Sequence, residues 1–168
     1  GDIPGKDDLA NVGGVLRREK TPDQISALKL GEEQTTTDAV FYQLTQPAAA
    51  DVTVTVDADA TLVDEYNKDK QGDAKLTLFP LENVTFEGGK TLTVKRGEKT
   101  SPALTVTLSR EGVEKGAYLL PLRATVANND MSPSEKDQVI YYRILVGEIV
   151  PETQLDAYAF KIVGYVNT

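Results

Sequence analysis

Apolar and polar residues alternate most regularly in residues 52–60. Every second position of this stretch is apolar: Val52, Val54, Val56, Ala58 and Ala60. Successive side chains of a β-strand point to opposite faces, so a period of two is typical of a half-buried strand. Residues 52–60 are therefore expected to form a strand with one face in the core and the other in water.

Segments rich in Val, Thr, Leu and aromatic residues recur at short intervals on both sides of this strand. They are residues 25–31, 35–47, 75–80, 82–89, 90–97 and 103–109. Gly88-Gly89 and Arg96-Gly97 supply turn positions, which predicts that these segments pair as antiparallel neighbours.

The two longest apolar segments are residues 116–126 and 138–147. The second has one set of side chains at Val139, Tyr141 and Leu145 and the opposite set at Ile140, Tyr142, Ile144 and Val146. Because both sets are largely apolar, this segment is expected to be a central strand covered on both faces. In the first segment, Pro121 has no N–H to donate to a ladder, which predicts a bulge or an edge position there.

Only residues 62–72 (LVDEYNKDKQG) indicate a helix, one or two turns long and ended by Gly72. Around eight short strands, one brief helix and regular turns predict an all-β sandwich over residues 25–147, with a closed barrel as the alternative. Residues 1–24 are polar and lack periodicity, as in a tether or a loosely docked segment. Residues 148–160 have the composition of a linker.

Composition excludes several classes of function. The 168 residues are enough for one domain with a core of its own. There is no Cys and no His, which removes disulfides, thiolate metal sites, Cys nucleophiles and His-based general bases. The 26 acidic and 18 basic residues give a net charge of -8, which disfavours binding to nucleic acid or anionic membranes. No apolar stretch approaches the roughly 20 residues of a membrane-spanning helix.

Asp57 and Asp59 lie two residues apart near Glu65, as in a pair of catalytic carboxylates. Such a pair works only if one carboxyl has a raised pKa while the other stays ionised. In a strand both would project from the solvent face, so a solvated face is the preferred interpretation. The run also differs from the catalytic signature of family-18 glycoside hydrolases, because Thr61 stands where the glutamate should be.

Residues 67–78 resemble a calcium loop in their first half. Asn67, Asp69, Gln71 and Gly72 have the required spacing, but Leu78 stands at the twelfth position, where such loops carry a bidentate Glu. We therefore expect neither a metal site nor a cofactor.

Sugar binding by stacking needs an exposed aromatic platform. The chain has no Trp and seven Tyr. Tyr141 and Tyr142 are adjacent, so only one can face inward, and Tyr142 is taken as the candidate ligand-binding residue, with Tyr66 and Tyr118 as further candidates. The alternative is that these rings are partly buried at a domain interface. No catalytic motif is present, so the chain is not expected to be an enzyme.

Several pieces of the chain occur in a recognisable order. They are Tyr66-Asn67 at the end of the short helix, residues 86–94 with their Gly88-Gly89 turn, and residues 118–122 (YLLPL). Over roughly residues 25–147 the chain resembles the N-terminal domain of unknown function found in secreted and surface proteins of the Bacteroidetes. The resemblance implies an immunoglobulin-like antiparallel β-sandwich of about seven to eight strands with one short helix.

The resemblance also implies a lipid anchor before the domain, a location on the outer face of the outer membrane or in the medium, and a further module after the domain. In many such proteins that module is a family-18 glycoside hydrolase of the endo-β-N-acetylglucosaminidase type, or a glycan-binding relative. The family's sandwich carries no catalytic residues. The expected function is thus a non-catalytic module that positions a C-terminal glycan-active or glycan-binding module.

The last eight residues, KIVGYVNT (161–168), resemble the first strand of such a barrel, because apolar residues follow one another rather than alternate. The alternatives are an edge strand of the sandwich or a docked tail. Two other functions stay open: the sandwich itself binds glycans through exposed Tyr side chains, or it binds proteins through an uncovered strand edge.

Overall fold

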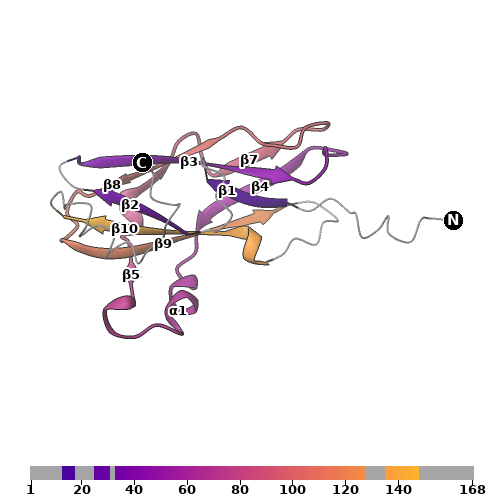
Figure 1. The fold of residues 1–168 in the computed structure, drawn as a ribbon. Helices are drawn as coiled ribbons and strands as arrows, with labels where there is room; N and C mark the ends of the chain where they lie inside the picture. The colour runs from indigo at the N-terminus through magenta and orange to yellow at the C-terminus, as the bar shows by residue number, and fades with distance from the viewer. Residues whose placement is uncertain (1–12, 18–24, 31–32, 128–134, 148–168) are drawn as a thin grey trace.

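The computed structural model describes residues 13–17, 25–30, 33–127 and 135–147, which form two β-sheets packed face to face (Figure 1). The first sheet contains, in order, β1 (Gly13–Arg17), β3 (Thr35–Leu44), β8 (Leu104–Ser109) and β6 (Val84–Phe86). The second sheet contains, in order, β2 (Ile25–Leu30), β10 (Val139–Val146), β9 (Gly116–Val126), β4 (Val52–Ala58) and β7 (Thr91–Val94), with β5 (Thr77–Leu78) beside β9. The helical elements are α1 (Leu62–Asn67) and 3-10 turns at Gly72–Ala74, Leu81–Asn83 and Glu135–Gln138.

The strand order is that of an immunoglobulin-like sandwich. Such domains place strands A, B, E and D in one sheet and C, F and G in the other. Here β1, β3, β8 and β6 take the first set of positions, and β4, β9 and β10 take the second. The predicted all-β sandwich with one short α-helix is confirmed, and two separate sheets replace the alternative barrel. Two pairings differ from the antiparallel expectation, since β2 runs parallel to β10 and β5 runs parallel to β9.

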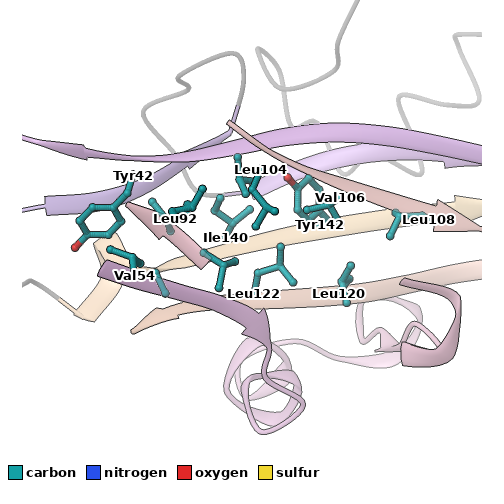
Figure 2. Packing of buried hydrophobic residues seen from close by; sticks show 14 of the residues in the cluster. Tyr42, Val54, Leu92, Leu104, Val106, Leu108, Leu120, Leu122, Ile140 and Tyr142 are labelled. Carbon is teal, nitrogen blue, oxygen red and sulfur yellow. The ribbon is translucent and has the colours of Figure 1, made fainter. Parts of the chain in front are cut away.

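The core lies between the two sheets and is built from strands with a period of two. Val52, Val54 and Val56 of β4 are buried as predicted, whereas Thr55 and Asp57, which follow Val54 and Val56, are exposed. Figure 2 shows Val54, Leu120 and Leu122 of the second sheet below side chains of β8 in the first. Because burying one such side chain contributes about 1.5–3 kcal/mol, this layer is the main source of stability.

β10 is buried on both faces, as the sequence predicts. Ile140, Tyr142, Ile144 and Val146 belong to the core between the sheets. On the opposite face, Tyr141 packs against a second, smaller cluster. The first sheet covers one face of β10, and Tyr66 of α1 packs against Tyr141 on the other.

Pro121 lies inside the second sheet, so the prediction of a bulge or an edge position is wrong. β9 has β10 on one side and β4 on the other, and its register with β10 is unbroken from Gly116 to Arg123. The carbonyl of Pro121 accepts a hydrogen bond of 2.9 Å from the N–H of Asp59. The N–H and C=O of a strand residue point to the same side, so the missing N–H faces the end of β4 and leaves the ladder with β10 intact.

Residues 13–17 form β1, so the prediction of a tether over residues 1–24 is wrong for this part. β1 pairs antiparallel with β3, and Val15 is fully buried. The carbonyl of Gly13 accepts a hydrogen bond of 2.7 Å from Nε2 of Gln138. A Cβ on Gly13 would lie 2.8 Å from Cζ of Tyr42, so the ring can lie this close only to a glycine. Residues 1–12 and 18–24 lie outside the described residues.

The sequence predicted that the helix ends at Gly72, but α1 ends at Asn67. Lys68 is the C-cap residue, and Gly72 adopts a positive φ of 57° at the start of the following 3-10 turn. At the end of the helix, both polar atoms of the Asn67 side chain bond to the backbone of Leu76.

Candidate functional site on the outer face of the second sheet

Between β4 and β5, the segment that contains α1 and Leu76 lies on the outer face of the second sheet. In Figure 1, α1 and the turns around β5 project from β9 on the side away from β3 and β8. Tyr66, Leu76 and Leu119 are buried together there, with Ala117 and Tyr141 packed against them. This face therefore combines an apolar cluster with ionisable side chains.

Asn67 fastens this segment to itself and does not present a metal ligand. Its Oδ1 accepts a hydrogen bond of 3.0 Å from the N–H of Leu76, and its Nδ2 donates one of 2.8 Å to the carbonyl of Leu76. Both polar atoms of the amide are thus engaged with one backbone residue. In the described part of the chain, no group of three or more Asp, Glu, His or Cys side chains could hold a metal ion.

Tyr66 packs beneath Tyr141, and its ring is too buried to stack on a ligand. Its side chain is buried, and its ring packs against the ring of Tyr141 with centroids 5.3 Å apart. Nζ of Lys70 lies 4.0 Å from the ring centroid, and Cζ of Arg143 lies 5.6 Å from it. Burial raises the pKa of the Tyr66 hydroxyl, and the charge of Arg143 opposes that rise. The sequence analysis gave Tyr66 as a candidate for ligand contact, but its ring is buried and does not support that role.

Asp59 and Arg123 form an ion pair at the edge of α1. Oδ2 of Asp59 accepts a hydrogen bond of 2.8 Å from Nε of Arg123, and Oδ1 accepts two from Thr61, at 3.0 Å from N–H and 2.6 Å from the hydroxyl. The bond from the Thr61 hydroxyl, followed by the contact with Arg123, lowers the pKa of Asp59. A general acid needs a raised pKa, so Asp59 has the opposite property. Asp57 pairs instead with Lys90, at 3.0 Å.

Tyr141 is the outward member of the adjacent Tyr pair. It lies opposite Pro121 in β9, and Pro121 in turn lies beside Asp59. The ring is partly exposed, and burial of its remainder raises the pKa of the hydroxyl. The sequence indicated that one of the two Tyr must face outward but could not select it.

Tyr142, the sequence-predicted ligand-binding residue, faces the core, so that prediction is wrong. Only 1% of its surface is exposed, and its hydroxyl donates a hydrogen bond of 2.9 Å to Oδ2 of the buried Asp38. Ile140 and Ile144 lie on the same face of β10 and are buried with it. A ring in this position cannot stack on a sugar.

Tyr118, the third sequence-predicted candidate, has a structural role. It stands near the start of β9, and its hydroxyl donates a hydrogen bond of 2.8 Å to the carbonyl of Glu114. Immunoglobulin-like domains carry such a tyrosine corner at the start of strand F, two residues before the second Cys of antibody domains. Here the fully buried Leu120 stands at that Cys position. No Cys is present to mark the motif, so the sequence analysis missed it.

These features define the class of protein as an immunoglobulin-like sandwich with an insertion on the outer face of its second sheet. Residues 17–131 match the sequence profile of a family described as an N-terminal domain. The chain belongs to this family of N-terminal domains, as its resemblance to a Bacteroidetes domain predicted. A comparison with curated proteins found no match.

Solved structures from Bacteroides species share the fold. EndoBT-3987 of Bacteroides thetaiotamicron, solved with a Man5GlcNAc product, is 20% identical, with a TM-score of 0.67 over 79% of this chain and 30% of that one. A Bacteroides ovatus protein assigned provisionally to carbohydrate binding is 18% identical, with a TM-score of 0.65 over 79% of this chain and 36% of that one. A two-domain protein of unknown function from Bacteroides fragilis is 17% identical, with a TM-score of 0.64 over 84% of this chain and 47% of that one. The chain thus spans less than half the length of each.

Proposed function

We propose that this sandwich is a non-catalytic accessory module that positions a glycan-active or glycan-binding module in a longer protein. The observation that carries the proposal is the match of residues 17–131 to a family of N-terminal domains. Two similar structures support a link to glycans, since one was solved with a Man5GlcNAc product and the other is assigned provisionally to carbohydrate binding. Both are about three times as long as the region that they share with this chain.

The end of β10 has a geometry that suits a positioning role. β10 is held between β2 and β9, and the carbonyl of the next residue, Gly147, accepts a hydrogen bond of 3.0 Å from Nη1 of Arg110. The backbone at residue 147 is therefore fixed relative to the sandwich. A fixed point of departure limits the orientations that a following module can take. Residues 161–168, the predicted first strand of that module, lie outside the described residues.

The proposed non-catalytic role is supported by the contacts of the two carboxylates that the sequence analysis weighed as a catalytic pair. Asp59 is held in its ionised form by Thr61 and Arg123, and Asp57 is paired with Lys90. A carboxyl with a lowered pKa, such as that of Asp59, does not supply the protonated general acid that glycoside hydrolysis requires. In the described part of the chain, no helix is long and apolar enough to span a membrane. The proposed location is the outer face of the outer membrane or the medium, as for the family that the sequence resembles.

The proposal is tested with a glycoprotein that carries Man5GlcNAc-type glycans, incubated with the 168-residue chain and, separately, with the product of the whole gene. We expect no released glycan from the 168-residue chain, because Asp57 and Asp59 are not arranged as an acid/base pair. Release by this chain alone, abolished by Asp59→Asn and retained by Lys95→Gln, would overturn the proposal. Lys95 is exposed and lies outside the candidate site, so its variant controls for a general effect of charge.

A further inference from the structure

We propose that the outer face of the second sheet carries a binding site for an uncharged saccharide, formed by Asp59, Glu65, Lys68, Arg123 and Tyr141. This group of side chains is called the Tyr141 site below. The choice of a saccharide as ligand class rests on the proposed function, whereas the position of the site rests on the contacts of these residues. The proposed accessory role does not require saccharide binding at the Tyr141 site.

The backbone register places the components side by side. Asp59, Pro121 and Tyr141 form one row across three neighbouring segments, because the N–H of Asp59 bonds to Pro121 and Pro121 is opposite Tyr141. Arg123 is two residues further along β9 on the same face, within reach of Tyr141 across the diagonal. Glu65 and Lys68 belong to α1 and its C-cap and flank Tyr66 in the chain, and the ring of Tyr66 packs against the ring of Tyr141.

The aromatic ring is held in place before any ligand arrives. Tyr141 packs on Tyr66, whose own ring contacts Lys70 and Arg143 and whose side chain is buried. The helix that carries Tyr66 is in turn fastened by the two hydrogen bonds between Asn67 and Leu76. A ring fixed in this way loses little conformational entropy when a ligand stacks on it.

The charges of the site are already neutralised in pairs. Asp59 bonds to Arg123 at 2.8 Å, and Glu65 bonds to Lys68 at 2.6 Å, so two negative and two positive groups cancel. The chain as a whole has a net charge of -8, which repels acidic ligands. A neutral site on an acidic protein favours an uncharged ligand over an acidic one.

A saccharide matches this combination of groups. The apolar face of a pyranose ring can lie on the exposed part of Tyr141, as ligands do on aromatic rings generally. Adjacent hydroxyls of the sugar can accept from a guanidinium and donate to a carboxylate, and both groups stand beside the ring at Arg123 and Asp59. Their side chains are 28% and 24% exposed, so they are accessible yet held in position.

The test is a titration of the 168-residue chain with the oligosaccharide Man5GlcNAc. The measurement is the change in the backbone amide NMR chemical shifts during the titration. We expect shifts confined to α1, the residues around Arg123 and the middle of β10. Tyr141→Ala should weaken binding about tenfold, and Tyr141→Phe, which keeps the ring, should bind as the wild type does. Lys95→Gln should also leave affinity unchanged. Thermal unfolding of each variant identifies any loss of affinity that comes from loss of the folded structure. Arg123→Gln tests a second residue of the Tyr141 site in the same titration.

Three results of the saccharide titrations would overturn the site. They are no shifts with Man5GlcNAc, shifts confined to another face, and equal binding of the acidic trisaccharide sialyllactose. A concentration-dependent oligomer with shifts at the Tyr141 site in the absence of sugar would identify the face as a protein interface instead, and would also overturn the proposal. Each of these outcomes leaves the glycan-release result unaffected, because the absence of release by the 168-residue chain does not depend on saccharide binding at the Tyr141 site.

Discussion

The hydroxyl of Tyr142 in β10 donates a hydrogen bond of 2.9 Å to Oδ2 of Asp38 in β3, inside the sandwich. A second buried bond joins the sheets in the opposite sense, since the hydroxyl of Tyr42 in β3 donates to Oε1 of Gln138, next to β10, at 2.8 Å. Buried polar groups stabilise a fold only when they are satisfied. The two Tyr side chains therefore fix how the sheets face each other.

Tyr142→Phe should lower the free energy of unfolding by about 1–3 kcal/mol, because it removes a donor from a buried carboxylate. Urea denaturation of the 168-residue chain measures this change. Tyr141→Phe is the matched control, since it removes the hydroxyl of the adjacent, partly exposed ring and should change stability little. Equal effects of the two substitutions would contradict the assignment of Tyr142 to the core.

Gly13→Ala should destabilise the protein by roughly 1–3 kcal/mol, because the new methyl group would overlap the ring of Tyr42. The measurement is again urea denaturation, now as a double-mutant cycle. In a Tyr42→Leu background the same Gly13→Ala substitution should cost much less, since the smaller side chain leaves room for the methyl group. Identical costs in both backgrounds would mean that β1 does not pack on Tyr42.

Asn67→Asp distinguishes the hydrogen-bond role of Asn67 from a calcium site. Asp lacks the Nδ2 donor to the carbonyl of Leu76, so the variant should be less stable by about 1 kcal/mol, with or without calcium. Thermal unfolding in EDTA and in excess calcium measures both conditions. A calcium loop would give the opposite result, because Asp is the stronger ligand and the variant would gain stability from the ion.

Alkaline pH should destabilise the protein through Tyr42. Burial raises the pKa of Tyr42 from 10.0 to about 12 in the folded state. The folded state thus holds the proton more tightly than the unfolded state does, and this contribution is complete below pH 10 and is lost as the pH rises to about 12. Its size is roughly 1.4 kcal/mol for each unit of pKa difference. Urea denaturation between these pH values should show a shallower fall in Tyr42→Phe than in the wild type, and equal slopes would contradict the assignment.

The strands could be predicted from the sequence because most of them have a period of two and are separated by turn residues. β1 was missed because it is short and contains Gly13 and Gly14, which give no such pattern. Its strand character comes from pairing with β3 and from the Tyr42 ring lying on Gly13. These are long-range contacts, which a local pattern does not contain.

The candidate site was harder to predict than the fold. Both faces of β10 carry apolar residues, so periodicity could not decide whether Tyr141 or Tyr142 faces outward. The answer depends on α1 covering one face and the first sheet covering the other. The pair of Asp59 and Arg123 likewise follows from the register of β4 against β9, which is set by packing across 64 residues of chain.

The proposed positioning role is tested most directly by a flexible Gly-Ser spacer inserted after residue 147 in the product of the whole gene. The measurement is the release or the binding of glycan, made once with free oligosaccharide and once with an intact glycoprotein. We predict that the spacer leaves the result on free oligosaccharide unchanged and weakens it several-fold on the glycoprotein, because a longer and more flexible connection to the sandwich would loosen the proposed positioning of the following module. Unchanged results on both substrates would contradict the positioning role.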